Sequence, residues 1–529
     1  MNKDWKRTLI VLIPKINNPK SADSYRPISL CNTVYKIATK ILLNRMEGII
    51  PKLISLEQAA FLKGRSLQDH ILIANELIHK FRFSKAYKGL VSIKLDMKQA
   101  YETMGWPTLK NILKYFEFPD FFSMLILECV QNPTFLILIN GTPSKWIKAR
   151  CGFRQGCPLS PCLFILCSQL LSNAINEKDD FGIRVSSISP RITHLLYADD
   201  IIFFAEAKIK NVRTIKGIVN TYCDWTGQKV NTNKTSMLFG KAVNIVKRKK
   251  IKRIMGFKEV KEFNYLGSKL SVKRLSKSDF QFMLDKIMKK LNNWGTRFFS
   301  LSGKITMAKY VILSIPSFHS TVSLVPKSII KEVERICHNF IWNKSNENLG
   351  MHYVCWKKLC DPYEQGGRGI QSCLSKTGPL RAKLAWKYMK DHDSLLHKYL
   401  FPKYGSCWKA ENRNKSISTA WKIIKDGSKS LKDIVSWNVS NGHSIDVFED
   451  IWIWDKSLNK WPTFVNTHEI GNDAIKVDCL ISDNQWSITD LKKYFGKDLM
   501  DLILNININP DLIEDQFELI HMESGRTIT

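Results

Sequence analysis

The sequence predicts a mixed α+β fold in which an antiparallel sheet is backed by helices. Val91, Ile93 and Leu95 alternate with polar residues, as in a half-buried strand, and helical spacing resumes at Leu109. The segment 194–205 is apolar, β-branched and aromatic except at its centre. This composition favours a tight hairpin with acidic residues at its tip, although a helix with two buried Asp is the competing interpretation.

A loop with two glycines, residues 152–161, lies between these two segments in the sequence. An amphipathic helix is predicted to follow the loop, and its apolar face is marked by Leu163, Leu166, Leu170 and Leu171. Ser160 is expected to cap this helix, with Pro161 at its first position. The first turn would offer free N–H groups and a positive dipole end to an anion.

Length and composition bound the class of protein. The 529 residues are 44% hydrophobic, which is enough to bury cores and excludes global disorder. At roughly 150 residues per domain, the length predicts three or four domains. The formal net charge of +32 indicates a phosphate-bearing partner, such as nucleic acid, an anionic membrane or a nucleotide. The plain alternative is a basic protein that is merely soluble.

Export and membrane insertion are not expected. No apolar run approaches the roughly 18–20 residues that a membrane span needs, and the N-terminus lacks the pattern of a signal peptide. The 13 cysteines are scattered along the chain, which suggests reduced thiols in an intracellular protein rather than a disulfide framework.

The charge is unevenly distributed along the chain. Residues 241–297 hold 17 Lys and Arg against 4 Asp and Glu, and the densest point is the run 247–253. Residues 461–529 instead hold 5 Lys and Arg against 12 Asp and Glu. The acidic tail is therefore expected to be a separate element that does not touch nucleic acid. A nucleic-acid surface and a nuclear-import signal explain the basic run equally well.

Three carboxylates stand at the ends or turns of the predicted β elements. Asp96 ends the predicted strand, and Asp199 and Asp200 lie at the tip of the predicted hairpin. A solvated turn residue is the ordinary explanation of an isolated Asp, but an Asp pair in an apolar segment is costly to bury without a cation. Hard carboxylate oxygens suit Mg²⁺, and two such ions can support displacement at phosphorus.

Several motifs, in order, resemble those of the non-LTR (LINE-type) retrotransposon reverse transcriptases, in their plant-like form. The central box is Tyr197-Ala198-Asp199-Asp200, a match to the active-site motif of that family. The other matching segments are Leu12–Lys15, Tyr25–Leu30, Gln58–Ser66, Leu95–Tyr101, Arg154–Pro161, Phe263–Gly267, Leu301–Lys304 and Phe340–Asn343. Together they cover residues 1–345.

The resemblance implies the fold of a right-hand polymerase. Residues 1–270 would form the fingers and the palm, 271–345 a helical thumb, and 346–529 a mixed C-terminal connection region that ends in the acidic tail. In the thumb, Phe282, Ile287, Met288 and Leu291 are expected to mark the apolar side of a helix. The endonuclease and RNase H domains of longer relatives are expected to be lacking.

Roles at the chemical centre carry over from the family by motif position. Asp96 and Asp199 would bind two Mg²⁺ ions, for which Mn²⁺ could substitute, with Asp200 assisting. Tyr101 matches the aromatic residue that excludes a ribose 2′-OH, and a packed strand–helix junction residue is the alternative. Glu102 stands where the family usually has Asp, a change that we expect to be tolerated.

Further residues would contact the nucleotide and the nucleic acid. Gln155 and Gly156 would line the incoming nucleotide and the template base. Arg65 matches the arginine that grips the triphosphate, unless it is a surface arginine. Lys234 fits a basic residue near the leaving pyrophosphate, unless it is an ordinary solvated lysine. The duplex would be held by its phosphates at Lys247, Arg248, Lys249, Lys250, Lys252 and Arg253.

The implied function is that of an RNA-directed DNA polymerase, a nucleotidyltransferase that adds deoxynucleotides to a primer 3′-OH. Its partners would be an RNA template, a DNA primer and deoxynucleoside triphosphates, without a membrane, and its location would be nuclear. A catalytically silent nucleic-acid-binding relic and an intron-maturase-like RNA-binding protein are the alternatives. His352, Cys355 and Cys360 invite a zinc site, for which a structural role is the alternative.

Overall fold

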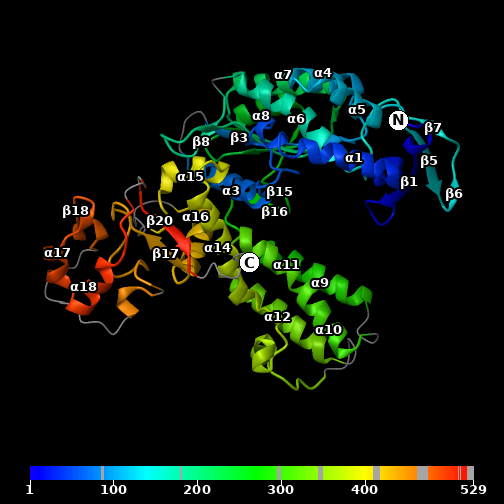
Figure 1. Ribbon diagram of the computed structural model, residues 1–529. Helices are drawn as coiled ribbons and strands as arrows, with labels where there is room; N and C mark the ends of the chain where they lie inside the picture. The colour runs from blue at the N-terminus through cyan, green and yellow to red at the C-terminus, as the bar shows by residue number, and fades with distance from the viewer. Residues whose placement is uncertain are drawn as a thin grey trace. The chain divides into compact units, whose positions relative to one another are not determined.

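The computed structural model describes residues 1–84, 89–178, 181–294, 299–343, 350–408, 417–454, 456–460, 475–509, 512 and 514–520. Its internal contacts divide the chain into two units (Figure 1). The first unit holds residues 1–275 together with 392–405 and 418–420, and the second holds 276–391, 406–417 and 421–529. The assignment of residues 1–270, 271–345 and 346–529 to fingers and palm, thumb and connection region stays a prediction.

The first unit is built around a five-stranded sheet with the order β10-β11-β3-β13-β14. Its strands are β10 (His194–Tyr197), β11 (Asp200–Glu206), β3 (Leu90–Leu95), β13 (Ser236–Phe239) and β14 (Lys258–Glu259). All neighbours are antiparallel except β13 and β14, which are parallel. The predicted strand before Asp96 and the predicted hairpin are both confirmed, so the helical interpretation of the second segment is wrong.

The two faces of this sheet have different covers. On one face Val91, Ile93 and Leu95 join the main hydrophobic core with residues of helices above the sheet in Figure 1. These helices are α4 (Trp106–Tyr115), α6 (Ser160–Asn176), α7 (Ile209–Thr226) and α8 (Ile245–Met255). The even-numbered residues of β3, such as Lys94, point to the opposite face because side chains alternate along a strand.

The opposite face is covered by a helix pair and a hairpin. These elements are α3 (Leu67–Phe83), α15 (Leu395–Tyr404), β15 (Glu262–Tyr265) and β16 (Ser268–Ser271), which lie below the sheet in Figure 1. Lys94 reaches this layer, since its ammonium group donates a 2.8 Å hydrogen bond to the carbonyl of Asn264 in β15. The phenol of Tyr265 lies 3.4 Å from Nδ1 of His70 in α3.

A second sheet of the first unit has the order β2-β1-β5-β6, and β7 also pairs with β5. Its strands are β1 (Arg7–Pro14), β2 (Tyr25–Cys31), β5 (Thr134–Ile139), β6 (Thr142–Pro143) and β7 (Ile147–Lys148). The other helices of the first unit include α1 (Thr33–Met46), α2 (Ile50–Leu53) and α5 (Asp120–Val130). Two-stranded pairs complete the unit, namely β4 (Met97–Lys98) with β12 (Lys229–Val230) and β8 (Ile183–Arg184) with β9 (Arg191–Ile192).

The second unit begins with a group of helices. They are α9 (Gln281–Trp294), α10 (Leu301–Met307), α11 (Ser314–Val322), α12 (Lys327–Trp342), α13 (Trp356–Cys360) and α14 (Cys373–Lys390). In α9 the buried residues are Met283, Leu284, Ile287 and Leu291. The prediction for Phe282 and Met288 is wrong, because these side chains are 42% and 44% exposed. No helix within the described ranges is both long and apolar enough to cross a membrane.

The C-terminal part of the second unit contains α16 (Thr419–Leu431), β17 (Val435–Asn438), β18 (Ile481–Ser482), β19 (Gln485–Trp486), α17 (Ile488–Tyr494), α18 (Lys497–Leu504) and β20 (Gln516–Leu519). Strand β20 pairs with β17, and Phe517 contacts the rings of Trp386, Trp408 and Trp437. The tail is therefore not a separate element, because its strand belongs to a sheet with residues 435–438.

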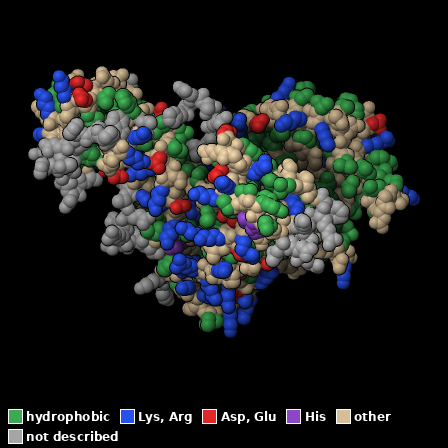
Figure 2. Space-filling view, turned by 90° about the horizontal axis from the view of Figure 1, so that it is seen from below, with side chains coloured by type: hydrophobic (Ala, Val, Ile, Leu, Met, Phe, Trp, Pro, Cys, Tyr) green, Lys and Arg blue, Asp and Glu red, His purple; other side chains and the backbone are tan. Residues whose placement is uncertain are grey.

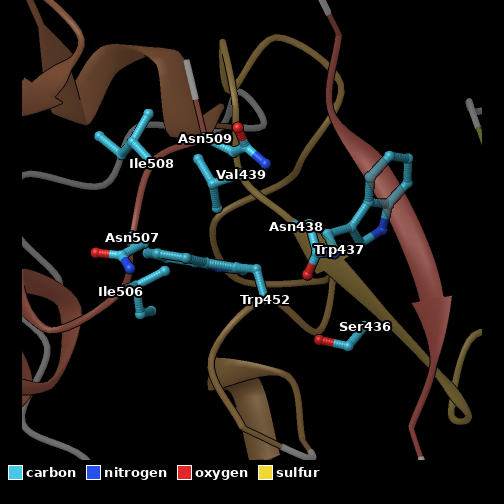
Figure 3. A pocket seen from close by; sticks show the side chains of 9 residues that line it. All are labelled: Ser436, Trp437, Asn438, Val439, Trp452, Ile506, Asn507, Ile508 and Asn509. Atoms are coloured by element: carbon cyan, nitrogen blue, oxygen red, sulfur yellow. The ribbon is translucent and has the colours of Figure 1, made fainter. Parts of the chain in front are cut away.

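A pocket of about 400 Å³ lies beside β17 (Figure 3). In this view the indole of Trp452 extends toward Asn507, and Trp437 turns toward β20. Both indoles are buried, at 4% and 6% exposure, and the N–H of Trp452 donates to the carbonyl of Val447. These tryptophans therefore pack the unit rather than offer open ring faces.

Candidate active site

The three predicted carboxylates lie at the ends of two neighbouring strands. Ala198 and Asp199 form the two-residue turn between β10 and β11, across which Tyr197 pairs with Asp200. On the other side β11 pairs with β3 through Ile201 and Leu95, so Asp200 and Asp96 follow one another across the ladder. Asp96 and Asp200 therefore lie on the face of the sheet that also carries Lys94, opposite the main core.

Each carboxyl group has a different environment. Lys94 forms a 3.1 Å ion pair with Asp200. Asn231 donates its side-chain amide to Oδ2 of Asp96 at 2.9 Å and its backbone N–H to the Asp96 carbonyl at 2.7 Å. The side chain of Asp199 is exposed to solvent. The protein atoms around the turn nevertheless remove part of its hydration and so raise its pKa, and the charges of Asp200 and Asp96 raise it further.

The chemistry of these donors fits Mg²⁺. Asp199 carries a negative charge that its surroundings disfavour, and a divalent cation would relieve this cost. Among the described residues no three His, Cys, Asp or Glu side chains are grouped as a ready metal cage. Mg²⁺ usually takes one or two protein carboxylates and completes its shell with water and phosphate oxygens, so such a cage is not required.

The glycine loop packs tightly against the segment that follows β4. The backbone N–H groups of Gly152 and Phe153 donate to the carbonyls of Met104 and Tyr101 at 2.8 and 2.7 Å. Gly152 has a φ of +89°, and a Cβ there would lie 2.4 Å from the carbonyl oxygen of Glu102. Only glycine permits this approach, so the loop is held beside Tyr101 and Glu102.

The next part of the loop packs against β2. Gly156 has a φ of +118°, and a Cβ there would lie 2.6 Å from the carbonyl oxygen of Ser29. The N–H of Ser29 donates to the Gln155 carbonyl at 2.7 Å. The helix after the loop begins at Ser160 itself, with Leu159 as the N-cap and no side-chain cap. The prediction that Ser160 caps the helix is therefore wrong by one position.

Tyr101 and Gln155, the two residues predicted beside the nucleotide, both lie near the acidic turn. The ring of Tyr101 stacks on Phe164 with centroids 4.6 Å apart, and burial followed by Asp199 raises the pKa of its phenol. The amide of Gln155 donates to a carboxylate oxygen of Glu102 at 2.6 Å. The structure thus brings both residues and Glu102 into one neighbourhood.

Arg65 lies elsewhere and already has several partners. Its guanidinium donates to the carbonyls of Gln58 at 2.6 Å and Ile54 at 2.7 Å, and also to those of Ser55 and Pro51. Its side chain is half-buried. Its role as a triphosphate ligand stays a prediction, and it would require these hydrogen bonds to be exchanged.

Lys234 is exposed in the turn after β12. Its backbone N–H donates to the carbonyl of Asn231, the residue that binds Asp96. Lys234 therefore belongs to the same turn as the residue that binds Asp96, which is compatible with its predicted role. An ordinary solvated lysine would occupy the same place, so the role stays a prediction.

The basic run lies on α8, on the other face of the sheet from Asp96 and Asp200. Ile251 and Met255 of this helix join the main core with the helices of that face. The exposed cations of the run are Lys249, Lys250, Lys252 and Arg253. Whether they and the half-buried Lys247 bind nucleic acid stays a prediction.

Arg248 in the same run has a structural role. It forms a 3.0 Å ion pair with Glu259 and donates to the carbonyls of Val243 and Gly240 at 2.9 and 3.2 Å. Lys252 also lies 3.8 Å from Glu259. Arg248 therefore joins α8 to β14 and the loop after β13, which the run of basic letters could not show.

The suspected zinc ligands are not grouped. The ring of His352 packs on His338 at 4.2 Å, and Cys355 is exposed. Cys360 is half-buried beside Glu334, whose charge, after burial, raises the pKa of the thiol. Glu334 accepts from the N-terminal N–H groups of α14, which accounts for its burial without a metal.

Three residues at the site were missed by sequence reasoning. Lys94 pairs with Asp200 and Asn231 binds Asp96, as described above. Gln58 accepts a 3.1 Å hydrogen bond from the N–H of Ala198. Gln58 lies inside a motif segment and Lys94 beside one, but the partners of all three residues are distant in the sequence, so only the fold reveals the contacts.

Comparison with known proteins matches the part of the chain that holds this site. Residues 13–270 match the sequence profile of the family described as reverse transcriptase (RNA-dependent DNA polymerase). A putative ribonuclease H protein of Arabidopsis thaliana is 28% identical over 194 residues, 35% of this chain and 31% of that protein. An uncharacterized 149 kDa protein of transposon TX1 from Xenopus laevis is 22% identical over 388 residues, 73% of this chain and 29% of that protein.

Other relatives carry explicit names. The Pol polyprotein from the type-1 retrotransposable element R2 of Nasonia vitripennis is 26% identical over 198 residues, 37% of this chain and 18% of that protein. The chain spans about a third or less of the length of these curated relatives. The solved structure of apo telomerase from Candida tropicalis has a TM-score of 0.36 and 15% identity, and covers 75% of this chain and 69% of that chain.

Residues 13–270 therefore match the reverse transcriptase family. Relatives of this chain are named as proteins of transposons and retrotransposable elements.

Proposed function

We propose that this chain is an RNA-directed DNA polymerase that extends a primer 3′-OH with deoxynucleotides. The observation that carries the proposal is the convergence of Asp96, Asp199 and Asp200 at the ends of adjacent strands. Tyr101 and Gln155, from the loop and turn beside them, complete a centre suited to phosphoryl transfer.

In this proposal the parts of the fold take the roles of a right-hand polymerase. The sheet β10-β11-β3-β13-β14 is the palm, and the β1–β2–β5 sheet with α1 to α3 forms the fingers. Helices α9 to α12 of the second unit form the thumb. The β17–β20 pair and the helices around it form the connection region.

The carboxylates would hold two Mg²⁺ ions, which lower the pKa of an attacking hydroxyl and neutralise charge on the phosphates when bound. Asp96 and Asp199 are the proposed ligands, with Asp200 assisting. Asn231 fixes the orientation of Asp96, and Lys94 balances the charge of Asp200. Groups that are already in position before the substrate binds stabilise the transition state more than groups that must reorganise during the reaction.

Selection of a deoxynucleotide is proposed to depend on Tyr101. Its ring is stacked on the buried Phe164, so it cannot turn aside to admit a 2′-OH. Gln155 presents its backbone and amide at the same edge, with the amide held by Glu102.

An RNA template and a DNA primer are the proposed nucleic-acid partners. The face of the molecule seen in Figure 2 carries many Lys and Arg side chains and few Asp and Glu. Exposed cations of the proposed thumb are Lys286, Lys289, Lys327 and Lys331. Such side chains bind phosphates without reading sequence, as a polymerase requires.

Primer extension tests the proposal directly. The purified chain, given Mg²⁺, deoxynucleotides and a DNA primer on an RNA template, is expected to lengthen the primer, and Asp199→Asn is expected to abolish the reaction. Binding of the duplex without any extension by the wild-type chain would refute the polymerase and support the silent relic.

A further inference from the structure

One buried side chain holds the turn that carries Asp199. Gln58 is completely buried, and its amide oxygen accepts hydrogen bonds from the N–H groups of Ala198 at 3.1 Å and Ala60 at 2.9 Å. Its amide nitrogen donates to the hydroxyl of Ser168 in α6 at 3.2 Å. A single amide thus joins the acidic turn, the segment before α3 and helix α6.

The backbone around Gln58 reinforces this link. The N–H of Leu196 donates to the carbonyl of Glu57 at 2.7 Å, and the N–H of Ala59 donates to the carbonyl of Leu196 at 3.1 Å. Gln58 and Leu196 therefore form a parallel bridge beside β10. The segment 57–59 acts as a short additional neighbour of the strand that leads into the turn.

The turn needs such support because its backbone is unusual. Ala198 has a φ of +54°, a left-handed conformation that is disfavoured for a residue with a Cβ. The residue is 7% exposed, so its N–H has no ready replacement partner in water. If the Gln58 oxygen were removed, this donor would be buried without a partner.

Arg65 fixes the same segment from behind. Its guanidinium binds the carbonyl of Gln58 itself and three carbonyls at residues 51–55. The arginine predicted to grip a triphosphate is thus placed to hold the support of the acidic turn.

We propose that Gln58 is a positioning residue that sets the place of Asp199 relative to Asp96, and that Arg65 anchors it. The inference rests on the proposed function only in that Asp199 is taken to serve catalysis. Gln58 touches no substrate; it acts through the N–H of Ala198, one peptide away from the carboxylate.

The chain offers a matched control for this proposal. Gln169 is also buried, accepts a 3.0 Å hydrogen bond from the N–H of Ser55 and donates to Asn173 at 2.7 Å. It ties the same segment to α6 but does not contact the turn. Gln169→Leu therefore removes a similar buried amide, whereas Gln58→Leu removes the amide that reaches Ala198.

The kinetic test compares these variants by pre-steady-state primer extension. The burst amplitude gives the active fraction, so a lower amount of folded protein is separated from a slower rate per molecule. Gln58→Leu is expected to slow the burst rate about ten-fold with an unchanged Kd for the primer–template, and Gln169→Leu to leave the rate within about two-fold. An equal rate in Gln58→Leu and wild type, or equal losses in both leucine variants, would overturn the proposal.

Amide hydrogen exchange tests the same link without activity. Exchange at the Ala198 N–H is expected to be at least about ten-fold faster in Gln58→Leu than in wild type, and unchanged in Gln169→Leu. Unchanged exchange in Gln58→Leu would refute the positioning role even in an active enzyme. If the wild-type chain does not extend a primer, the polymerase proposal fails while this measurement still decides the support of the turn.

Discussion

The side-chain amide of Gln155 donates a 2.6 Å hydrogen bond to the carboxylate of Glu102, 53 residues earlier in the chain. Burial, with a smaller contribution from Asp199, raises the pKa of Glu102, while Lys15 lowers it. The glutamate that stands where the family usually has Asp is therefore part of the site, and its extra methylene spans the distance to the loop.

Replacing Glu102 tests whether this contact positions Gln155 for the nucleotide. In Glu102→Ala the amide of Gln155 loses its partner and becomes free to rotate. We expect the KM for deoxynucleotides to rise roughly five- to ten-fold while kcat changes less than about two-fold, the pattern of lost ground-state binding. Steady-state primer extension measures both constants, with Glu47→Ala, an exposed glutamate, as the control. A fall in kcat at constant KM would contradict this role.

Asp199→Asn is expected to reduce primer extension by about three orders of magnitude or more, because a proposed metal ligand is lost. The same variant tests the raised pKa of Asp199. A carboxyl with a raised folded pKa makes the folded state progressively less stable as pH rises from its ordinary pKa to the raised one. At neutral pH, without divalent cations, Asp199→Asn should therefore melt at a higher temperature than wild type.

Added Mg²⁺ should raise the melting temperature of the wild-type chain more than that of Asp199→Asn, because ligand binding to the folded state is stabilising. Thermal unfolding with and without millimolar Mg²⁺ measures this difference. A lower melting temperature of the variant than of the wild-type chain in chelator would contradict the raised pKa of Asp199.

Charge reversal on α8 tests whether nucleic acid binds on the face of the sheet that α8 covers. The variant Lys249→Glu/Lys250→Glu/Arg253→Glu changes charges on the face opposite Asp96 and Asp200, and surface charges beyond about 10 Å are screened at physiological salt. We expect the Kd for a short primer–template to change less than about two-fold. Lys286→Glu/Lys289→Glu on α9 is expected to weaken binding about ten-fold, as measured by fluorescence anisotropy. A larger increase in Kd for the α8 variant than for the α9 variant would instead support binding of the duplex at α8.

His194 predicts a loss of stability in acid. It is completely buried on β10 between the hydroxyls of Ser172 and Thr193, and burial lowers its pKa from 6.5 to about 4. Its contribution is fully present above pH 6.5 and is lost as pH falls toward 4, because the unfolded chain takes up the proton first. Urea unfolding should show up to about 3 kcal/mol less stability at the lower end.

The variant His194→Gln keeps an amide for these hydroxyls and should flatten this part of the pH profile. His319→Gln in the second unit should flatten the profile in the same way, since burial also lowers the pKa of His319 to about 4. A wild-type profile that does not differ from that of His194→Gln would contradict the assignment.

Sequence reasoning predicted the elements whose pattern is local. The alternation that ends at Leu95 and the apolar hairpin around Asp199 gave strands because side-chain period is a property of a few neighbouring residues. The order of the strands in the sheet was not predicted, since pairing of β3 with β11 and β13 joins segments more than 100 residues apart.

The environment of individual side chains was harder to predict. The letters of α8 read as one basic surface, yet Arg248 is bound to Glu259 and two carbonyls. Phe282 read as core, although the register of α9 exposes it. Gln58 and Asn231 have polar side chains that suit almost any turn, and only long-range contacts give them a role.

The helix α15 carries a practical consequence for any shortened version of this chain. It is more than 300 residues from α3, yet Lys403 forms a 2.5 Å ion pair with Glu76 of α3, whose side chain is 1% exposed. A polypeptide ending near residue 345 would retain every proposed catalytic carboxylate but lose α15, the packing of that helix on α3 and the ion pair of Lys403 with Glu76. We therefore expect gene fragments or natural truncations that stop there to yield less stable protein than the full chain.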